Sequence, residues 1–198
     1  MELLGGNSMT LDDIIEKHNI YINNFEELLD YIIHSDDSFS LDLFPYAIEN
    51  DKKYKQVEIF YQGYLDKDIS NATFLEEEKK FHNFFKLLWL YDNFYVSVAI
   101  SKKDIRKNHY ARLNRKEIKN GLALISDSFK EFKFVDEYEK LKSIMVISTR
   151  EIAPSLIYCE KSELLIYFYG CQAAVLFLNN KYKEQINYLA KLNNLFLL

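Results

Sequence analysis

The sequence predicts an all-α protein, folded as a single-domain multi-helix bundle or as an array of helical hairpins. Three observations favour this fold class. The 198-residue chain contains only five Gly and two Pro. Apolar residues recur at helical spacing along most of it. The breaks between apolar segments are rich in Asn, Ser and Asp, which cap helices. Because β-hairpins use Gly, Pro and Asn-Gly at their turns, their scarcity here favours helices over a β-meander.

The expected helices of the N-terminal half follow one another with recognisable starts. The first covers Leu11–His18 behind Thr10, and the second runs from residue 25 to about 33 behind Asn23 or Asn24. A third covers residues 57–65. The fourth begins at a capping box formed by Thr73 and Glu76. It carries a long apolar stripe: Phe74, Phe81, Phe84, Phe85, Leu88 and Tyr91. On this helix we expect Phe81, Phe85, Leu88 and Trp89 to form core.

The C-terminal half continues the helical pattern. Ser101 with Asp104, and Asn114 with Glu117, mark two further starts, the second followed by apolar positions as far as Phe132. Helical spacing continues over 135–148, and Pro154 suits the first turn of a helix begun near residue 148. A helix over 162–178 and another over 181–196 then form a C-terminal hairpin, 162–198.

An alternative fold remains open for residues 143–178. The segments 144–147, 156–158 and Leu164–Tyr169 are rich in β-branched and aromatic residues, and short apolar runs of this kind also suit buried strands. The alternative is therefore an α+β fold with a helical N-terminal half and a small C-terminal sheet.

The last thirty residues resemble a tetratricopeptide-type helical hairpin. The resemblance rests on a spaced set of residues: Tyr169, Ala173, Leu176, the turn Asn180-Lys181-Tyr182, Gln185, Leu189 and Leu192. Gln185 departs from the repeat, which has a small residue there, and no closing Pro follows. The resemblance implies protein or peptide binding and carries over no catalytic residue.

Length and composition set the remaining bounds. The length fits a single domain spanning residues 1–198. Cys159 and Cys171 are too few for a disulfide scaffold or a Cys-based zinc site, so we expect two packed thiols in a reducing cytosol. No secretory signal precedes Met9, itself an alternative start, and the longest apolar run is too short to span a bilayer. We therefore expect a cytoplasmic protein that does not act at a membrane.

Charge is distributed unevenly along the chain. Residues 1–50 contain eleven acids and one Lys, whereas residues 101–150 contain thirteen bases and seven acids. The acidic segment supplies a candidate partner surface: Glu26, Glu27, Asp30, Asp36 and Asp37. The basic stretch 102–119 supplies a second: Lys102, Lys103, Arg106, Lys107, Arg112, Arg115, Lys116 and Lys119. Each can contact a partner, the other surface, or water alone.

No catalytic motif is present, and we expect no enzyme activity, no cofactor and no metal. Asp30 with His34 and Glu78 with His82 stand four residues apart, which indicates solvated helix-surface pairs more simply than a metal site. Likewise, Glu76-Glu77-Glu78 is expected to be a solvated first turn. A helical nuclease using His109 with Arg106 or Arg112 is a third alternative.

These observations favour a non-catalytic protein-binding module. It would be a small inhibitor, immunity or anti-defence protein that presents charge to a partner, most simply a basic protein. The alternative is a helical peptide- or nucleic-acid-binding regulator that uses the basic stretch 102–119.

Overall fold

The computed structural model of the chain describes residues 8–22, 24–46, 61, 65, 71–100, 113–126 and 129–198, with the backbone alone at residues 71, 72 and 99. Within these ranges lie six α-helices: α1 (Leu11–His18), α2 (Phe25–His34), α5 (Asn71–Tyr91), α7 (Arg115–Leu124), α8 (Tyr138–Thr149) and α9 (Lys183–Leu192), the last preceded by a 3₁₀ turn, η1 (Asn180–Tyr182). The same ranges contain nine strands: β1 (Ser8–Thr10), β2 (Ser38–Asp42), β3 (Phe94–Ala99), β4 (Ile125–Ser126), β5 (Glu131–Phe134), β6 (Ser155–Cys159), β7 (Leu164–Tyr169), β8 (Gln172–Phe177) and β9 (Phe196–Leu197). The protein is a mixed α/β protein, so the all-α prediction is wrong.

The nine strands form one sheet, in which eight follow the order β1-β5-β3-β6-β7-β8-β2-β9 and β4 pairs with β3 beside this path. Neighbours along this path run antiparallel. β4 is the exception, since it pairs in parallel with the end of β3, where Val98 lies opposite Ile125. β4 and β5 therefore follow each other along the same edge of β3. The two outermost strands, β1 and β9, are the short ends of the sheet, and short edge strands discourage pairing with other chains.

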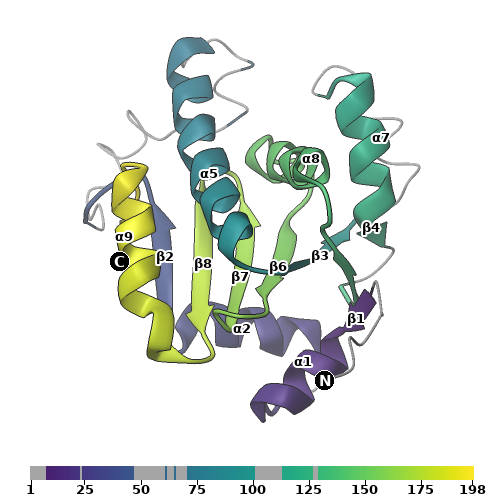
Figure 1. The fold of residues 1–198 in the computed structure, drawn as a ribbon, viewed down its shortest axis with the longest axis vertical. Coiled ribbons are helices and arrows are strands. Elements are labelled where there is room, and N and C mark those ends of the chain that lie inside the picture. Colours follow the sequence, from purple (N-terminus) through teal and green to yellow (C-terminus); the bar gives the residue numbers. More distant parts are fainter. Residues whose placement is uncertain are drawn as a thin grey trace.

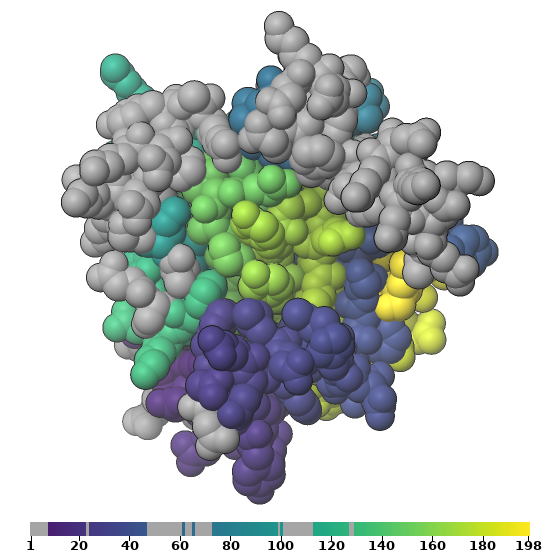
Figure 2. All heavy atoms as spheres, turned by 180° about the vertical axis from the view of Figure 1, so that it is seen from behind, coloured from purple at the N-terminus to yellow at the C-terminus, as the bar shows by residue number. Residues whose placement is uncertain are grey.

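Helices cover both faces of this sheet. α5, α7, α8 and α9 lie over one face, and α1 and α2 lie over the other (Figure 1). From the second side, α1 and α2 cover the lower part of the sheet, and strands β6–β8 are visible above them (Figure 2). Two separate clusters of buried side chains correspond to the two layers.

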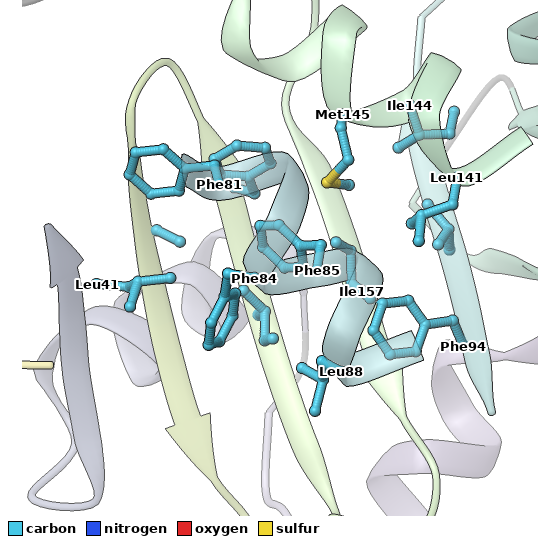
Figure 3. Close-up of a cluster of buried hydrophobic side chains, with 14 of the residues drawn as sticks. Leu41, Phe81, Phe84, Phe85, Leu88, Phe94, Leu141, Ile144, Met145 and Ile157 are labelled. Atoms are coloured by element: carbon cyan, nitrogen blue, oxygen red, sulfur yellow. The ribbon is translucent and has the colours of Figure 1, made fainter. Parts of the chain in front are cut away.

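The larger core lies beneath α5. Phe81, Phe84 and Phe85 are completely buried and project from α5 towards the sheet (Figure 3). The ring of Phe85 meets that of Phe168 on β7 at a centroid distance of 4.9 Å. The predicted core stripe is thus confirmed as far as Trp89, which is partly buried and donates its indole N–H to the Val135 carbonyl at 2.9 Å. Tyr91, the last residue of the apolar stripe, is 72% exposed.

Strands β6, β7 and β8 send alternate side chains into the two cores. Ile157 and Ile166 belong to the core beneath α5, whereas Leu156 and Leu165 belong to the core beneath α1 and α2. Because both faces are covered, these strands are apolar at nearly every position and lack the polar alternation of a half-exposed strand. Because a continuous apolar run also suits a buried helix, the sequence pattern predicted a helix over residues 162–178.

The predicted C-terminal helical hairpin, 162–198, is accordingly wrong, as is the helical-repeat array built on it. Its first helix is replaced by β7 and β8, and only α9 is helical in its second half. The α+β alternative correctly placed strands at 156–158 and Leu164–Tyr169, but residues 144–147 lie inside α8. Its sheet is also neither small nor confined to the C-terminus, because β1, β2 and β3 belong to it.

The hairpin turns are built with little Gly. Between β6 and β7, Glu163 adopts a φ of 52°, and the Asp92 carboxylate accepts hydrogen bonds from the backbone N–H groups of Lys161 and Ser162 at 2.8 and 2.9 Å. Between β7 and β8 the turn uses Gly170, at a φ of 65°. A carboxylate from the end of α5 thus replaces the Gly-based turn chemistry whose scarcity suggested helices.

Several helix starts are confirmed. Thr10 forms a capping box with Asp13, the Asn24 side chain accepts from the Glu27 N–H, and Asn114 forms a capping box with Glu117. Other boundaries differ: α5 is already helical at Asn71, before Thr73, and Phe132 lies in β5 rather than in a helix. The helix expected from Ser101 lies outside the described residues, as does the segment 57–65 except for residues 61 and 65.

Candidate protein-binding surface

The acidic candidate residues are organised by α2. Leu28 and Ile32, one turn apart, are completely buried and attach the helix to the sheet. The Asn24 side chain caps the helix by accepting from the Glu27 N–H at 2.9 Å, and its amide donates to the Glu27 carboxylate at 3.0 Å. Glu26 and Glu27 occupy the first turn, where carboxylates interact favourably with the helix dipole. The buried stripe therefore directs these acids to the solvent side.

A shallow hollow of about 540 Å³ lies on this acidic side of α2. We call it the acidic hollow, and its lining is as follows: Tyr21, Ile22, Glu26, Glu27, Asp30 and Tyr31. Tyr21 is 95% exposed and Tyr31 is 40% exposed, so both rings are available to a partner. Carboxylates and exposed aromatic rings thus share one concave surface.

Few cations of the described residues neutralise this surface. Glu26 forms no ion pair with any described residue, and Asp30 lies 3.7 Å from His34, a pair in which both side chains are exposed. This agrees with the solvated pair expected from the spacing of Asp30 and His34. Glu26 therefore faces solvent without a compensating cation among the described residues.

The five predicted acidic residues do not form a single patch. Glu26, Glu27 and Asp30 line the hollow, whereas Asp36 and Asp37 lie in the turn beyond the other end of α2. A ten-residue helix is about 15 Å long, so most of α2 separates Glu26 and Glu27 from Asp36 and Asp37. Asp37 also has a structural role, since its carboxylate accepts from the Asn180 amide at 2.8 Å and its carbonyl accepts from the Phe177 N–H. Tyr21 and Tyr31, which complete the hollow, were not singled out from the sequence.

The described part of the basic surface is on α7, over the opposite face of the sheet (Figure 1). Arg115, Lys116 and Lys119 are exposed, and Lys116 pairs with Glu139 of α8 at 2.8 Å. No ion pair between described residues joins α7 to α2. The other five basic candidates, Lys102, Lys103, Arg106, Lys107 and Arg112, lie outside the described residues, and so does His109.

Beside the acidic hollow, the last turn of α1 is tied to the sheet through Tyr158 of β6. The Tyr158 hydroxyl accepts from the Lys17 ammonium at 2.9 Å and lies 2.9 Å from His18 Nε2. Because Lys17 donates to this oxygen, the hydroxyl proton is available to a neutral His18. Burial, with the adjacent Lys17 charge, lowers the pKa of His18 and supports that neutral form.

A buried polar cluster joins α5 to α8, and the sequence reasoning missed it. Glu78 is 5% exposed and accepts from the Thr149 hydroxyl at 2.8 Å and from Arg150 Nε at 3.0 Å. The expectation of a solvated Glu78–His82 pair is therefore wrong, as is that of a fully solvated first turn. Nε2 of His82 is enclosed and has no hydrogen-bond partner among the described residues, and burial lowers the pKa of His82 to about 4. Local spacing carried no signal for this, because Arg150 is 72 residues from Glu78.

Other chemistry is limited in the described ranges. Cys159 and Cys171 are free and buried, and burial raises the pKa of both thiols, which disfavours the reactive thiolate. Across those ranges no group of three or more His, Cys, Asp or Glu side chains is placed to hold a metal. No helix among the described residues is long and apolar enough to cross a bilayer.

Comparison of the chain with family models, with curated proteins and with solved structures finds no match.

Proposed function

We propose that this chain is a non-catalytic protein-binding protein of the inhibitor, immunity or anti-defence type. It acts in the cytoplasm and engages a basic protein partner through the acidic hollow on α2. One observation carries the proposal: two exposed tyrosine rings, Tyr21 and Tyr31, border the carboxylates of Glu26, Glu27 and Asp30 in one concave surface.

The two kinds of side chain contribute differently to association. Tyrosine is enriched at the energetic centres of protein interfaces because it offers a large apolar surface with a polar end. Exposed carboxylates accelerate encounter with a basic partner and make the association rate sensitive to salt. Exposed charges contribute little to folding, typically less than about 1 kcal/mol per pair. The hollow therefore suits recognition without being needed for stability.

The test begins with capture of partners from a lysate of the native host, followed by purification of the captured protein. The wild-type chain is compared with the triple variant Glu26→Lys, Glu27→Lys, Asp30→Lys and with the control Arg115→Glu, Lys119→Glu on α7. We expect the triple variant to lower the association rate constant at least tenfold at low salt, with a smaller difference at high salt, as measured by surface plasmon resonance. The control should bind as the wild type does. All three should be folded at the temperature of the assay, and the triple variant should melt only slightly lower because it loses the first-turn carboxylates of α2.

A second variant separates the rings from the charges. Tyr31→Ser should raise the dissociation rate and leave the association rate nearly unchanged, and Tyr31→Phe should restore most of the affinity. Equal binding of the wild type and the acidic triple variant would disprove the proposal. Loss of binding in the α7 control, with nucleic acid recovered from the wild type, would instead support the regulator that uses the basic stretch.

A further inference from the structure

A second hollow, of about 570 Å³, lies in the opposite helical layer between the end of α5, the β6–β7 turn, η1 and α9. Its apolar lining includes Leu88, Ile186 and Leu189. Leu88 and Ile186 are only 3% and 2% exposed, so they are already packed in the core. The floor of the hollow is thus apolar and consists of side chains that are packed in the core.

Asp92 is the buried charged residue in the described lining of the hollow, and its hydrogen-bond acceptor positions are all occupied. The Asp92 carboxylate accepts from the backbone N–H groups of Asn93, Lys161 and Ser162 at 2.7, 2.8 and 2.9 Å, and also from the Ser162 hydroxyl. A carboxylate has about four acceptor positions, and these four donors fill them. A ligand group entering the hollow would therefore find no free charge at Asp92.

Tyr91 and Tyr188 line the hollow, and Leu192 extends its apolar surface further along α9. Tyr91 is 72% exposed, Tyr188 is 62% exposed, and Leu192, one turn after Tyr188 on α9, is 55% exposed. A small molecule held in the hollow would leave Leu192, which lies beyond the lining, in water. Extended exposed apolar surface of this kind is typical of protein–protein contacts, so the partner should be a macromolecule.

Two opposite charges border the same hollow. Lys161 and Glu184 both line it, both are exposed, and neither forms an ion pair with any residue that the structure describes. In a two-fold symmetric contact, the same patch meets itself, so one residue of a pair faces the other residue in the second copy. Lys161 of each copy would then face Glu184 of the other, so the contact would contain two equivalent Lys161–Glu184 ion pairs.

We propose that this surface, formed by Tyr91, Lys161, Glu184, Tyr188 and Leu192 around the hollow, binds a second copy of the chain in a two-fold symmetric dimer. The exposed tyrosines enter the hollow of the opposing copy, and the two Lys161–Glu184 pairs fix the orientation. Because α9 and α2 lie over opposite faces of the sheet (Figure 1), the dimer leaves the acidic hollow free. The inference does not depend on the function proposed for α2.

Charge reversal followed by mixing tests this geometry directly. Molar mass is measured by analytical ultracentrifugation from micromolar to millimolar concentrations. We expect the wild type to dimerise with rising concentration, and Lys161→Glu and Glu184→Lys each to weaken dimerisation at least tenfold. Mixing these two variants should restore dimers, because in a dimer of one copy of each variant, positions 161 and 184 that face each other carry opposite charges. The double variant Lys161→Glu, Glu184→Lys should also dimerise, for the same reason. Arg115→Glu and Glu16→Lys are matched controls outside this surface and should behave as the wild type does.

Tyr188→Ser tests the apolar contribution independently and should also weaken the dimer, with circular dichroism confirming that each variant is folded. A wild-type chain that stays monomeric at millimolar concentration would overturn the proposal. Dimerisation that neither charge variant weakens, or that mixing does not restore, would overturn it as well. The α2 triple variant should dimerise normally, so this result and the partner-binding result are independent.

Discussion

Arg150, at the end of α8, forms a two-point ion pair with Glu78 of α5: Nε lies 3.0 Å from Oε1, and Nη2 lies 3.3 Å from Oε2. Glu78 is buried, and the Arg150 side chain is 20% exposed. The pair connects two helices of the same layer above the larger core. Removal of one partner from such a pair leaves the other charge without compensation, which is more costly than the loss of a surface ion pair.

We therefore expect Glu78→Gln to lower the free energy of unfolding by about 3 kcal/mol, measured by urea denaturation. Glu139→Gln, which removes the exposed pair with Lys116, is the control and should cause no measurable change. The double variant Glu78→Leu, Arg150→Met should recover much of the loss, because apolar residues of similar volume can replace a buried ion pair. A loss equal to that of Glu139→Gln would show that the Glu78–Arg150 pair is solvated in solution.

His82 should make stability depend on pH. Burial lowers its pKa to about 4, against about 6.5 in an unfolded chain, although the Glu78 carboxylate opposes this and the Arg150 and Lys142 charges add to it. Between these two pKa values the unfolded chain binds more protons, so stability falls as the pH falls from about 6.5 to about 4. The shift corresponds to roughly 3 kcal/mol at full effect.

The measurement is the free energy of unfolding of the wild type and of His82→Phe at intervals between pH 7 and pH 4. The variant should lose less stability than the wild type on acidification, because its side chain cannot take up a proton. His34→Gln, at an exposed histidine, should follow the wild-type curve. Parallel curves for the wild type and His82→Phe would contradict the assignment of a buried, neutral His82.

Phe85 should be a major contributor to the core. It is completely buried and contacts the rings of Phe84 and Phe168, so truncation removes buried apolar area and leaves a cavity. We expect Phe85→Ala to cost about 3–5 kcal/mol in urea denaturation. Leu90→Ala, at a 59% exposed position of the same helix, is the matched control and should cost far less. A Phe85→Ala cost below about 1 kcal/mol would show that α5 does not pack as described.

Asp92 should determine the geometry of the β6–β7 turn. Asp92→Ala removes the acceptor for three backbone N–H groups and the Ser162 hydroxyl, and hydrogen bonds to a charged group contribute about 1.5–3 kcal/mol each. We expect a stability loss of at least about 2 kcal/mol and faster amide exchange at Lys161 and Ser162. Asp92→Asn should retain part of the effect, since its carbonyl oxygen still accepts. Unchanged exchange at both amides in Asp92→Ala would disprove this role.

Local hydrogen bonds made the helix starts of α1, α2 and α7 predictable. Thr10 and Asp13, Asn24 and Glu27, and Asn114 and Glu117 are each three residues apart, and their side chains satisfy backbone groups within a single turn. The exposure of the acids on α2 followed in the same way from the apolar spacing of that helix. Sequence alone therefore determined where these helices begin and which charges they present to solvent.

Tertiary structure alone decided that residues 155–177 form strands and not a helix. The apolar residues of this segment suit a buried helix as well as a buried strand, as Leu156, Ile157, Leu165 and Ile166 show. None of these four is polar because helices cover both faces of the sheet, so that both faces of these strands are buried. The turn between β6 and β7 depends on Asp92, which is 70 residues away from Ser162. Such contacts join residues distant in the chain, so their free energies leave no periodic trace in the sequence.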